Sequence, residues 1–229
     1  MKRAVVTYIF GRGKELLREP LKVDEDIEYI CVTDQKDLKS KVWKIVYDEI
    51  PQAGCIRDKM VYVKYCPFKY STADEICVID GSMEIKNSLM PLFEQLADND
   101  ILVKAHPERH NLLDELHAWI RMRHMPGEYV KKFEMMASHE NISLKTGFLI
   151  ESCVMLYKNN EKVNELCKMV ISLMSFLGKT PCLFLSNQIC LTFLLQSSFK
   201  CIRFTWLSQA NFFNRYRHNT KILNQRFNN

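Results

Sequence analysis

Two short segments decide the fold expected of this chain: Tyr29-Ile-Cys-Val-Thr-Asp34 and Glu75-Ile-Cys-Val-Ile-Asp80-Gly81-Ser82. Each is a run of β-branched and other apolar residues that closes on an aspartate, which is typical of a buried strand. In open parallel sheets the carboxyl ends of the strands meet at one edge, and ligands bind there. The two segments therefore predict an α/β fold with Asp34 and Asp80 at a common edge, and they favour a nucleotide site.

Similar strand patterns occur on both sides of these segments, separated by helical or irregular stretches. Strands are expected at residues 4–10, 27–33, 43–47, 75–79, 101–105, 145–157 and 202–206. Helices are expected at residues 57–65, 112–124, 128–136, 163–177 and 189–195, and a strand end followed by a helix at residues 83–96. This alternation predicts a Rossmann-like, mixed but mainly parallel sheet with helices on both faces.

Length and composition are those of one domain. The 229 residues, 47% of them hydrophobic, can fill a single core, and no linker rich in Gly, Ser or Pro divides them. There is no apolar run of about 18 residues and no signal-peptide pattern after Met1, so we expect a cytoplasmic protein. The nine cysteines contain no Cys-x-x-Cys pair and are expected to be reduced, mostly buried thiols.

The carboxyl-terminal residues are basic and aromatic. Residues 203–229 carry five Lys or Arg and no acid, within a chain of net charge +5. Such a tail suits an anionic membrane surface, a nucleic acid or the diphosphate of a ligand. A solvated terminal helix is favoured over peripheral membrane docking, which stays the alternative. No nucleic-acid partner is expected, because no binding module is present.

A series of motifs in order resembles the nucleotide-sugar glycosyltransferases of the GT-A fold. The series is Val6-Thr7-Tyr8-Ile9-Phe10-Gly11, Arg18-Glu19-Pro20, the Thr33-Asp34 strand end, Arg57-Asp58 and Ile79-Asp80-Gly81. More narrowly, it is similar to a family of glycosyltransferase-like proteins of bacteria and plants, linked to cell-wall and mucilage polysaccharides. The motifs are weak singly, and the likeness lies in their order and intervals.

The resemblance implies a donor site on the first two strands and the Asp80 strand. It makes Thr7, Tyr8 and Asp34 contacts to the base and ribose, and it places Asp80 as the first aspartate of an Asp-x-Asp metal motif. The second carboxylate is missing, because Ser82 stands there. The implied cofactor is Mn²⁺ or Mg²⁺, held by Asp80, the diphosphate and His218 near the carboxyl end.

Positive charge must then face the leaving diphosphate. The helix before the Asp80 strand carries Arg57, Lys59 and Lys64, and the resemblance points first at Arg57. Asn187-Gln188 stands where related enzymes carry Asp-Gln near the donor sugar. An amide can hydrogen-bond there, but it cannot act as a base or nucleophile as a carboxylate does.

The segment after the strand at residues 101–105 reaches the same sheet edge. The resemblance gives His106 a role in binding the acceptor or sugar, with Lys104 beside it. A base for an inverting reaction would come from Glu151, His106 or Glu108, which the sequence does not rank. The stereochemical outcome is left open.

These features together predict one domain with three parts: a nucleotide-binding half at residues 1–105, an acceptor half at 106–200 and the basic tail at 201–229. The expected function is transfer of a sugar, from a uridine diphosphate donor, to a growing surface polysaccharide or glycolipid. A degenerate protein that binds the nucleotide sugar without transfer is the first alternative. Nucleotidyl transfer to a sugar phosphate is a weaker one, because Gly11-Arg12-Gly13 is too short a glycine-rich loop.

Overall fold

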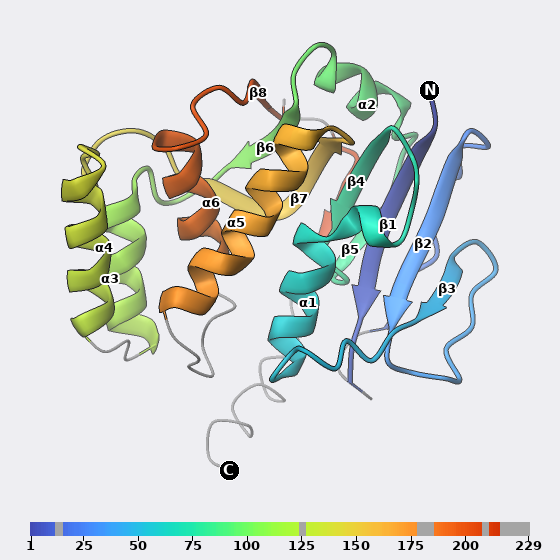
Figure 1. Cartoon of the computed structure of the whole chain (residues 1–229). Helices are drawn as coiled ribbons and strands as arrows, with labels where there is room; N and C mark the ends of the chain where they lie inside the picture. Colours follow the sequence, from blue (N-terminus) through green and yellow to red (C-terminus); the bar gives the residue numbers. More distant parts are fainter. Residues whose placement is uncertain (12–15, 124–126, 178–185, 208–210, 216–229) are drawn as a thin grey trace.

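The computed structural model describes residues 1–11, 16–123, 127–177, 186–207 and 211–215. Its centre is a seven-stranded sheet of order β3-β2-β1-β4-β7-β6-β8 (Figure 1). The strands of this sheet are β1 (Arg3–Ile9), β2 (Ile27–Thr33), β3 (Lys44–Tyr47), β4 (Glu75–Ile79), β6 (Ile101–Ala105), β7 (Ile150–Lys158) and β8 (Phe204–Trp206).

The sheet is mixed but mainly parallel. Strands β3, β2, β1 and β4 run the same way, and β8 runs parallel to β6. Strand β7 is antiparallel to both of its neighbours, β4 and β6, so β6 again points the same way as β4. The carboxyl ends of β1, β2, β4 and β6 therefore share one edge with the amino end of β7. The predicted α/β class is confirmed.

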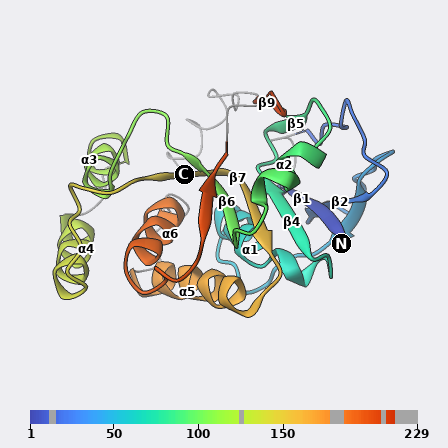
Figure 2. The ribbon, with the colours of Figure 1, turned by 90° about the horizontal axis from the view of Figure 1, so that it is seen from above.

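Helices cover both faces of the sheet, each over its own apolar core. On one face α1 (Ile56–Tyr65), α5 (Glu161–Leu177) and α6 (Ser186–Gln196) pack on Ala4, Val6 and Tyr8 of β1. On the other face α2 (Met90–Leu96) packs on Val5 and Ile9. Figure 2 shows these helices on opposite sides of the strands. Alternate residues of a strand point to opposite faces, so β1 supplies both cores.

A helical hairpin of α3 (Leu112–Arg123) and α4 (Gly127–His139) lies between β6 and β7 in the chain. Figure 1 shows the two helices side by side at one end of the molecule, next to α6. Buried Leu116 and Trp119 of α3 join the same core as α6. The chain then returns to the sheet as β7, which lies between β4 and β6, so residues 1–105 and 106–200 both build the sheet.

Strand β7 begins later than the expected strand at residues 145–157. The chain turns at Gly147, whose φ of 102° is open to glycine and unfavourable for other residues. The Gln196 side chain also approaches closely, because a Cβ at Gly147 would lie 2.8 Å from its Oε1. This turn keeps residues 145–149 out of the sheet.

A second, two-stranded sheet pairs β5 (Met83–Ile85) with β9 (Phe213–Arg215) in antiparallel fashion. The register sets Met83 opposite Arg215 and Ile85 opposite Phe213. The sequence did not predict β9, because three residues are too few to show a strand period. This pairing brings Arg215 close to the segment that follows Asp80.

The described cysteines are free thiols. Five of them are buried: Cys31, Cys77, Cys153, Cys167 and Cys190. Burial raises the pKa of Cys31 to about 12, only partly opposed by a hydrogen bond from the Ile9 backbone. Burial likewise raises the pKa of Cys153 to about 12, and nearby Asp80 and Glu151 add to this effect. These two thiols therefore stay protonated and serve as small core residues.

Within the described residues, none of the helices combines the length and apolar character needed to cross a membrane.

Candidate functional site at the carboxyl edge of the sheet

Asp80 lies at the centre of the candidate site, directly after β4. Its backbone N–H donates to the Cys153 carbonyl at 3.0 Å, and its carbonyl accepts from the Met83 N–H at 2.9 Å. These bonds fix the strand end, and 21% of the side chain is exposed. The carboxylate Oδ1 lies 2.9 Å from Lys64 Nζ and accepts a hydrogen bond from the Tyr8 hydroxyl. One oxygen thus faces two donors, from α1 and β1.

Lys64 is a buried cation, with only 2% of its side chain exposed. It lies in the last turn of α1 between Val63 and Tyr65, which are also buried. An ammonium group withdrawn from water needs a charged partner, and removing one member of a buried pair costs about 3–5 kcal/mol. The Asp80 carboxylate is therefore neutralised by a cation that belongs to the fold.

A chain of hydrogen bonds links this pair to Asn187 at the start of α6. The Lys64 ammonium donates to Ser152 Oγ at 3.4 Å, and the Ser152 hydroxyl donates to Asn187 Oδ1 at 2.6 Å. The Tyr65 hydroxyl donates to the same Asn187 oxygen at 3.3 Å. Asn187 is 2% exposed. It therefore acts from inside the protein, as an acceptor that orients the Ser152 and Tyr65 hydroxyls.

Asp34 forms a second carboxylate site after β2, the strand on the other side of β1 from β4. Its Oδ1 accepts from the Gly11 backbone N–H at 2.9 Å, and its Oδ2 lies 3.0 Å from Lys59 Nζ. Burial raises the pKa of Asp34, but the hydrogen bonds from Gly11 and Lys59 outweigh it and leave the pKa below its ordinary value. Asp34 is ionised at neutral pH and holds the end of β1 against the end of β2.

The other expected donor-site residues lie around these two aspartates. Thr7 and Tyr8 are each 2% exposed. The Thr7 hydroxyl donates to the Ile79 carbonyl at 3.2 Å, while the Tyr8 hydroxyl is directed at Asp80. Arg57 is half-buried in the first turn of α1. It is seven positions before Lys64, hence on the same helix face and roughly 10 Å along the axis.

Glu151 is the centre of a third cluster, at the amino end of β7. It is 5% exposed and is bound by Lys104 Nζ at 2.6 Å and by the Arg215 guanidinium. Burial raises the pKa of Glu151, but the charges and hydrogen bonds of Lys104 and Arg215 lower it by more, so the pKa lies below its ordinary value. A carboxylate so paired is a poor general base. The two cations keep 39% and 55% of their side chains exposed.

His106 follows β6 at the same edge. Its Nδ1 accepts from the backbone N–H groups of Glu108 and Arg109 at 3.2 and 3.1 Å, and Nε2 lies 2.7 Å from an Arg109 nitrogen. Burial and the Arg109 charge lower the pKa of His106, against the opposing effect of nearby carboxylates. His106 is therefore neutral near pH 7 and orders the loop that follows β6.

Glu115 connects the His106 loop to α6. Its buried carboxylate pairs with Arg109, accepts from Trp119 Nε1 at 3.0 Å and accepts from Gln188 Nε2 at 3.4 Å. Gln188 is the residue after Asn187, and its Oε1 accepts from the Ser152 N–H at 3.4 Å. The histidine cluster and the Asp80 cluster thus share one hydrogen-bonded edge.

The structure brings together most of the expected site residues. Tyr8, Lys64, Asp80 and Asn187 form one connected group. Asp34 lies across β1 from this group, and His106 lies across β7. His218 lies outside the described residues. The sequence missed Ser152 and Tyr65, which sit in an apolar strand run and an apolar helix face, and missed the placement of Arg215 by β9.

The fit of a metal ion can be tested on Asp80. A hard divalent cation needs several oxygen ligands. In the described ranges, no three His, Cys, Asp or Glu side chains gather so as to hold an ion, and Asp80 already accepts from Lys64 and Tyr8. Ser82, at the position of the missing second carboxylate, is 4% exposed. The described residues therefore do not offer the implied ligand set, and the Mn²⁺ or Mg²⁺ cofactor stays a prediction.

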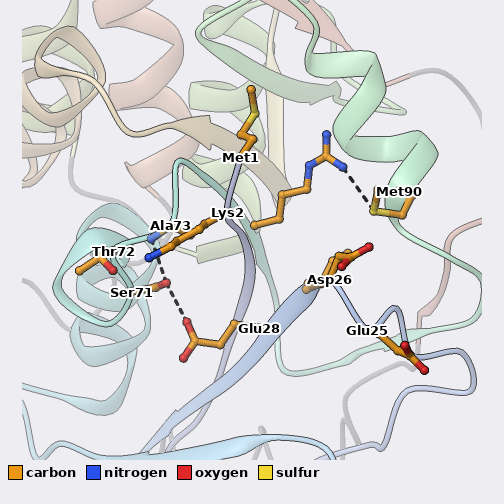
Figure 3. A pocket seen from close by; sticks show the side chains of 11 residues that line it. Met1, Lys2, Glu25, Asp26, Glu28, Ser71, Thr72, Ala73 and Met90 are labelled. Carbon is orange, nitrogen blue, oxygen red and sulfur yellow. Dashed lines mark hydrogen bonds between the residues drawn. The ribbon is translucent and has the colours of Figure 1, made fainter.

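A cavity of about 590 Å³ opens at the opposite edge of the sheet, around the amino ends of β1 and β2 (Figure 3). Several polar side chains at this cavity already have hydrogen-bond partners. The Ser71 hydroxyl donates to Glu28 at 3.0 Å, and Arg3 contacts Glu75 at 3.1 Å and the Met90 sulfur at 3.3 Å. Because it begins where β1 starts, this cavity is separate from the Asp80 cluster.

No protein-family model matches this chain, and no curated protein sequence matches it either. Among solved structures, the chain is similar to the glycosyltransferase GlyE of Streptococcus pneumoniae TIGR4, with 14% sequence identity and a TM-score of 0.47. The similarity covers 90% of this chain and 45% of the other, so the chain spans less than half the length of that protein.

Proposed function

We propose that this protein is a glycosyltransferase that takes its sugar from a nucleoside diphosphate donor. The observation that carries the proposal is the pair of aspartates at the carboxyl edge of the sheet. Asp34 and Asp80 follow the two strands that flank β1, and each is held by a lysine of α1. Ligands of open α/β sheets bind outside this edge.

The nucleoside is assigned to the Asp34 side of the edge. Asp34 is ionised and 18% exposed, so its carboxylate suits the hydroxyl groups of a ribose. Thr7 and Tyr8 are buried, and their hydroxyls donate to the Ile79 carbonyl and to the Asp80 carboxylate. In the proposal they shape the floor under the base.

The diphosphate is assigned to the cations along the edge. Arg57 lies in the first turn of α1, where the helix also presents backbone N–H groups. Lys104 and Arg215 add two partly exposed charges around the buried Glu151. Fixed positive charge aimed at the leaving group stabilises the transition state of sugar transfer.

The acceptor is assigned to the loop after β6. His106 is neutral and is held by Arg109 and the backbone, so it acts as a positioning residue on this side of the site. The resemblance supports a uridine donor and a surface polysaccharide or glycolipid acceptor. Contact with a membrane surface through the tail stays a prediction, because residues 216–229 are not described.

Calorimetric titration with uridine, guanosine, cytidine and thymidine diphosphates tests the proposal. We expect one of them to bind in the micromolar range, and we expect the matching nucleotide sugar to release free diphosphate over time. Asp34→Asn serves as the site control and should weaken binding of that nucleotide. Absence of binding by all four, in a protein shown to be folded, would overturn the proposal.

A second candidate is a binding protein that holds a nucleotide sugar without transferring the sugar. Asn187 favours it, because this buried amide is occupied by Ser152 and Tyr65 and replaces the acid of related enzymes. The two candidates differ in one measurement. Micromolar binding with no release of nucleoside diphosphate, in the presence of varied saccharide acceptors, would select the binding protein.

A further inference from the structure

We propose that Lys64 is the built-in cation of this site: its ammonium group holds the place at Asp80 that a divalent metal ion would need, and the nucleoside diphosphate binds without metal. The identity of the ligand rests on the proposed function. The statement about metal binding to Asp80 stands on the described geometry alone.

The Asp80 oxygen that a metal ion would need already has two hydrogen-bond donors. Lys64 Nζ lies 2.9 Å from Asp80 Oδ1, and the Tyr8 hydroxyl donates to the same atom. A Mg²⁺ ion coordinated by that oxygen would lie about 2.0–2.1 Å from it. The ion would therefore displace a hydrogen-bond donor and stand beside an ammonium group, and both effects oppose its binding.

Lys64 is held in place by burial and by a hydrogen bond. Only 2% of its side chain is exposed, and its neighbours Val63 and Tyr65 at the end of α1 are buried as well. Its ammonium donates to Ser152 Oγ, and the Ser152 hydrogen is given to Asn187 Oδ1. Because that amide oxygen can only accept a hydrogen bond, the Ser152 hydroxyl hydrogen is directed at it, and the lone pairs of Ser152 Oγ are left to accept from Lys64.

The charge around Asp80 points the same way. Ser82, two residues after Asp80, and Asn187, which binds Ser152 beside Lys64, are both uncharged side chains. One buried lysine therefore balances one carboxylate. Two more carboxylates would leave an excess negative charge, which is the arrangement that attracts a divalent ion.

Side chains also supply the charge that a metal would bring to the diphosphate. Met83 N–H is bonded to the Asp80 carbonyl at 2.9 Å and Met83 pairs with Arg215 across β5 and β9, so Arg215 reaches Glu151 beside the Asp80 turn. Lys104 reaches Glu151 from β6. Lys64, Lys104 and Arg215 face the carboxylates of Asp80 and Glu151, which leaves one positive charge for an anion.

Nucleotide binding in the presence and absence of metal tests the inference on the unmodified protein. The affinity for the bound nucleoside diphosphate should be the same in excess EDTA and in Mn²⁺, within about twofold. A loss of about tenfold or more in EDTA would overturn the inference. Lys64→Met should make binding of the same nucleotide depend on Mn²⁺, while Lys59→Met should weaken binding equally with and without Mn²⁺.

Electron paramagnetic resonance of added Mn²⁺ provides a readout that, for the unmodified protein, needs no nucleotide. Unmodified protein should leave the Asp80 site free of Mn²⁺. Lys64→Met should gain a bound ion when the nucleoside diphosphate is added and supplies further oxygen ligands, and Lys64→Met with Asp80→Asn should lose it again. Binding of Mn²⁺ to the unmodified protein that Asp80→Asn removes would overturn the inference. So would the absence of any gain in folded Lys64→Met that has the nucleoside diphosphate bound.

The nucleotide-binding and resonance experiments together distinguish a failure of the inference from a failure of the proposed function. If no nucleotide binds, the proposed function fails, and the resonance experiment still decides whether Mn²⁺ binds at Asp80 in the unmodified protein. If Lys64→Met does not fold, the comparison of EDTA with Mn²⁺ on the unmodified protein decides the inference.

Discussion

The two strand-end aspartates have the same kind of partner but different surroundings. Asp34 meets Lys59 at 3.0 Å and Asp80 meets Lys64 at 2.9 Å, and both lysines belong to α1. The side chains of Asp34 and Lys59 are each 18% exposed, whereas Lys64 is only 2% exposed. Two ion pairs of nearly equal length therefore differ in how far water reaches them, and we expect them to differ in strength and in how readily they exchange partners.

Helix geometry explains the difference. Lys59 and Lys64 are five positions apart, so their side chains leave α1 about 140° apart around its axis. Lys64 is directed into the protein together with its buried neighbours Val63 and Tyr65. Lys59 is directed at the loop end of β2, and its ammonium also lies 5.8 Å from the Phe10 ring. One helix thus supplies a permanent cation to β4 and a more accessible one to β2.

Removing Lys64 should produce the largest effect. Lys64→Met leaves Asp80 without its buried partner, and we expect the free energy of unfolding to fall by about 3 kcal/mol, at the lower end of the range for buried pairs because Asp80 is partly exposed. Urea denaturation measures this loss. Adding Asp80→Asn should restore much of the stability, and a double variant no more stable than the single one would contradict the pairing.

Removing Lys59 should produce a smaller effect. For Lys59→Met we expect a loss of about 1 kcal/mol in the free energy of unfolding, because water partly screens its pair with Asp34. The same urea experiment compares the two lysines directly. A loss equal to that of Lys64→Met would mean that burial does not distinguish the pairs.

The pH dependence of stability should show the smallest effect, from Asp34. Its pKa is lower in the folded protein than the ordinary value of about 3.9, so it stabilises the fold above that pH and this contribution is lost as pH falls through the folded value. We expect Asp34→Asn to flatten the decline in thermal midpoint below about pH 4. An unchanged slope in this variant would show that Asp34 gains nothing from Gly11 and Lys59.

The strand ends were predictable from sequence because a strand signal is local. The apolar runs before Asp34 and Asp80 identify β2 and β4 without reference to the rest of the chain. The reversed direction of β7 was not predictable in this way. A strand buried on both faces has the same apolar pattern whichever way it runs, and β7 is buried along nearly its whole length.

The roles within the site depend on tertiary contacts. The sequence placed Lys64 on the right helix and assigned it to the diphosphate, but the partner that it meets, Asp80, is set by how α1 packs on the sheet. Ser152 gave no signal inside its apolar run, and Arg215 is positioned by a strand pairing between distant segments. The resemblance predicted a ligand site at this edge, and packing decided which side chains meet there.

The pairing of β5 with β9 also sets an order of assembly during synthesis. Asn214 donates to Glu84 across 130 positions of sequence, whereas Lys64 and Asp80 belong to the earlier part of the chain. A nascent chain can therefore form the Lys64–Asp80 pair before residue 215 has been made. Among the described side chains, Glu151 is paired with Lys104 alone until β9 docks. The cluster of charges around Glu151 is thus completed only when β9 docks, after the Lys64–Asp80 pair can already have formed.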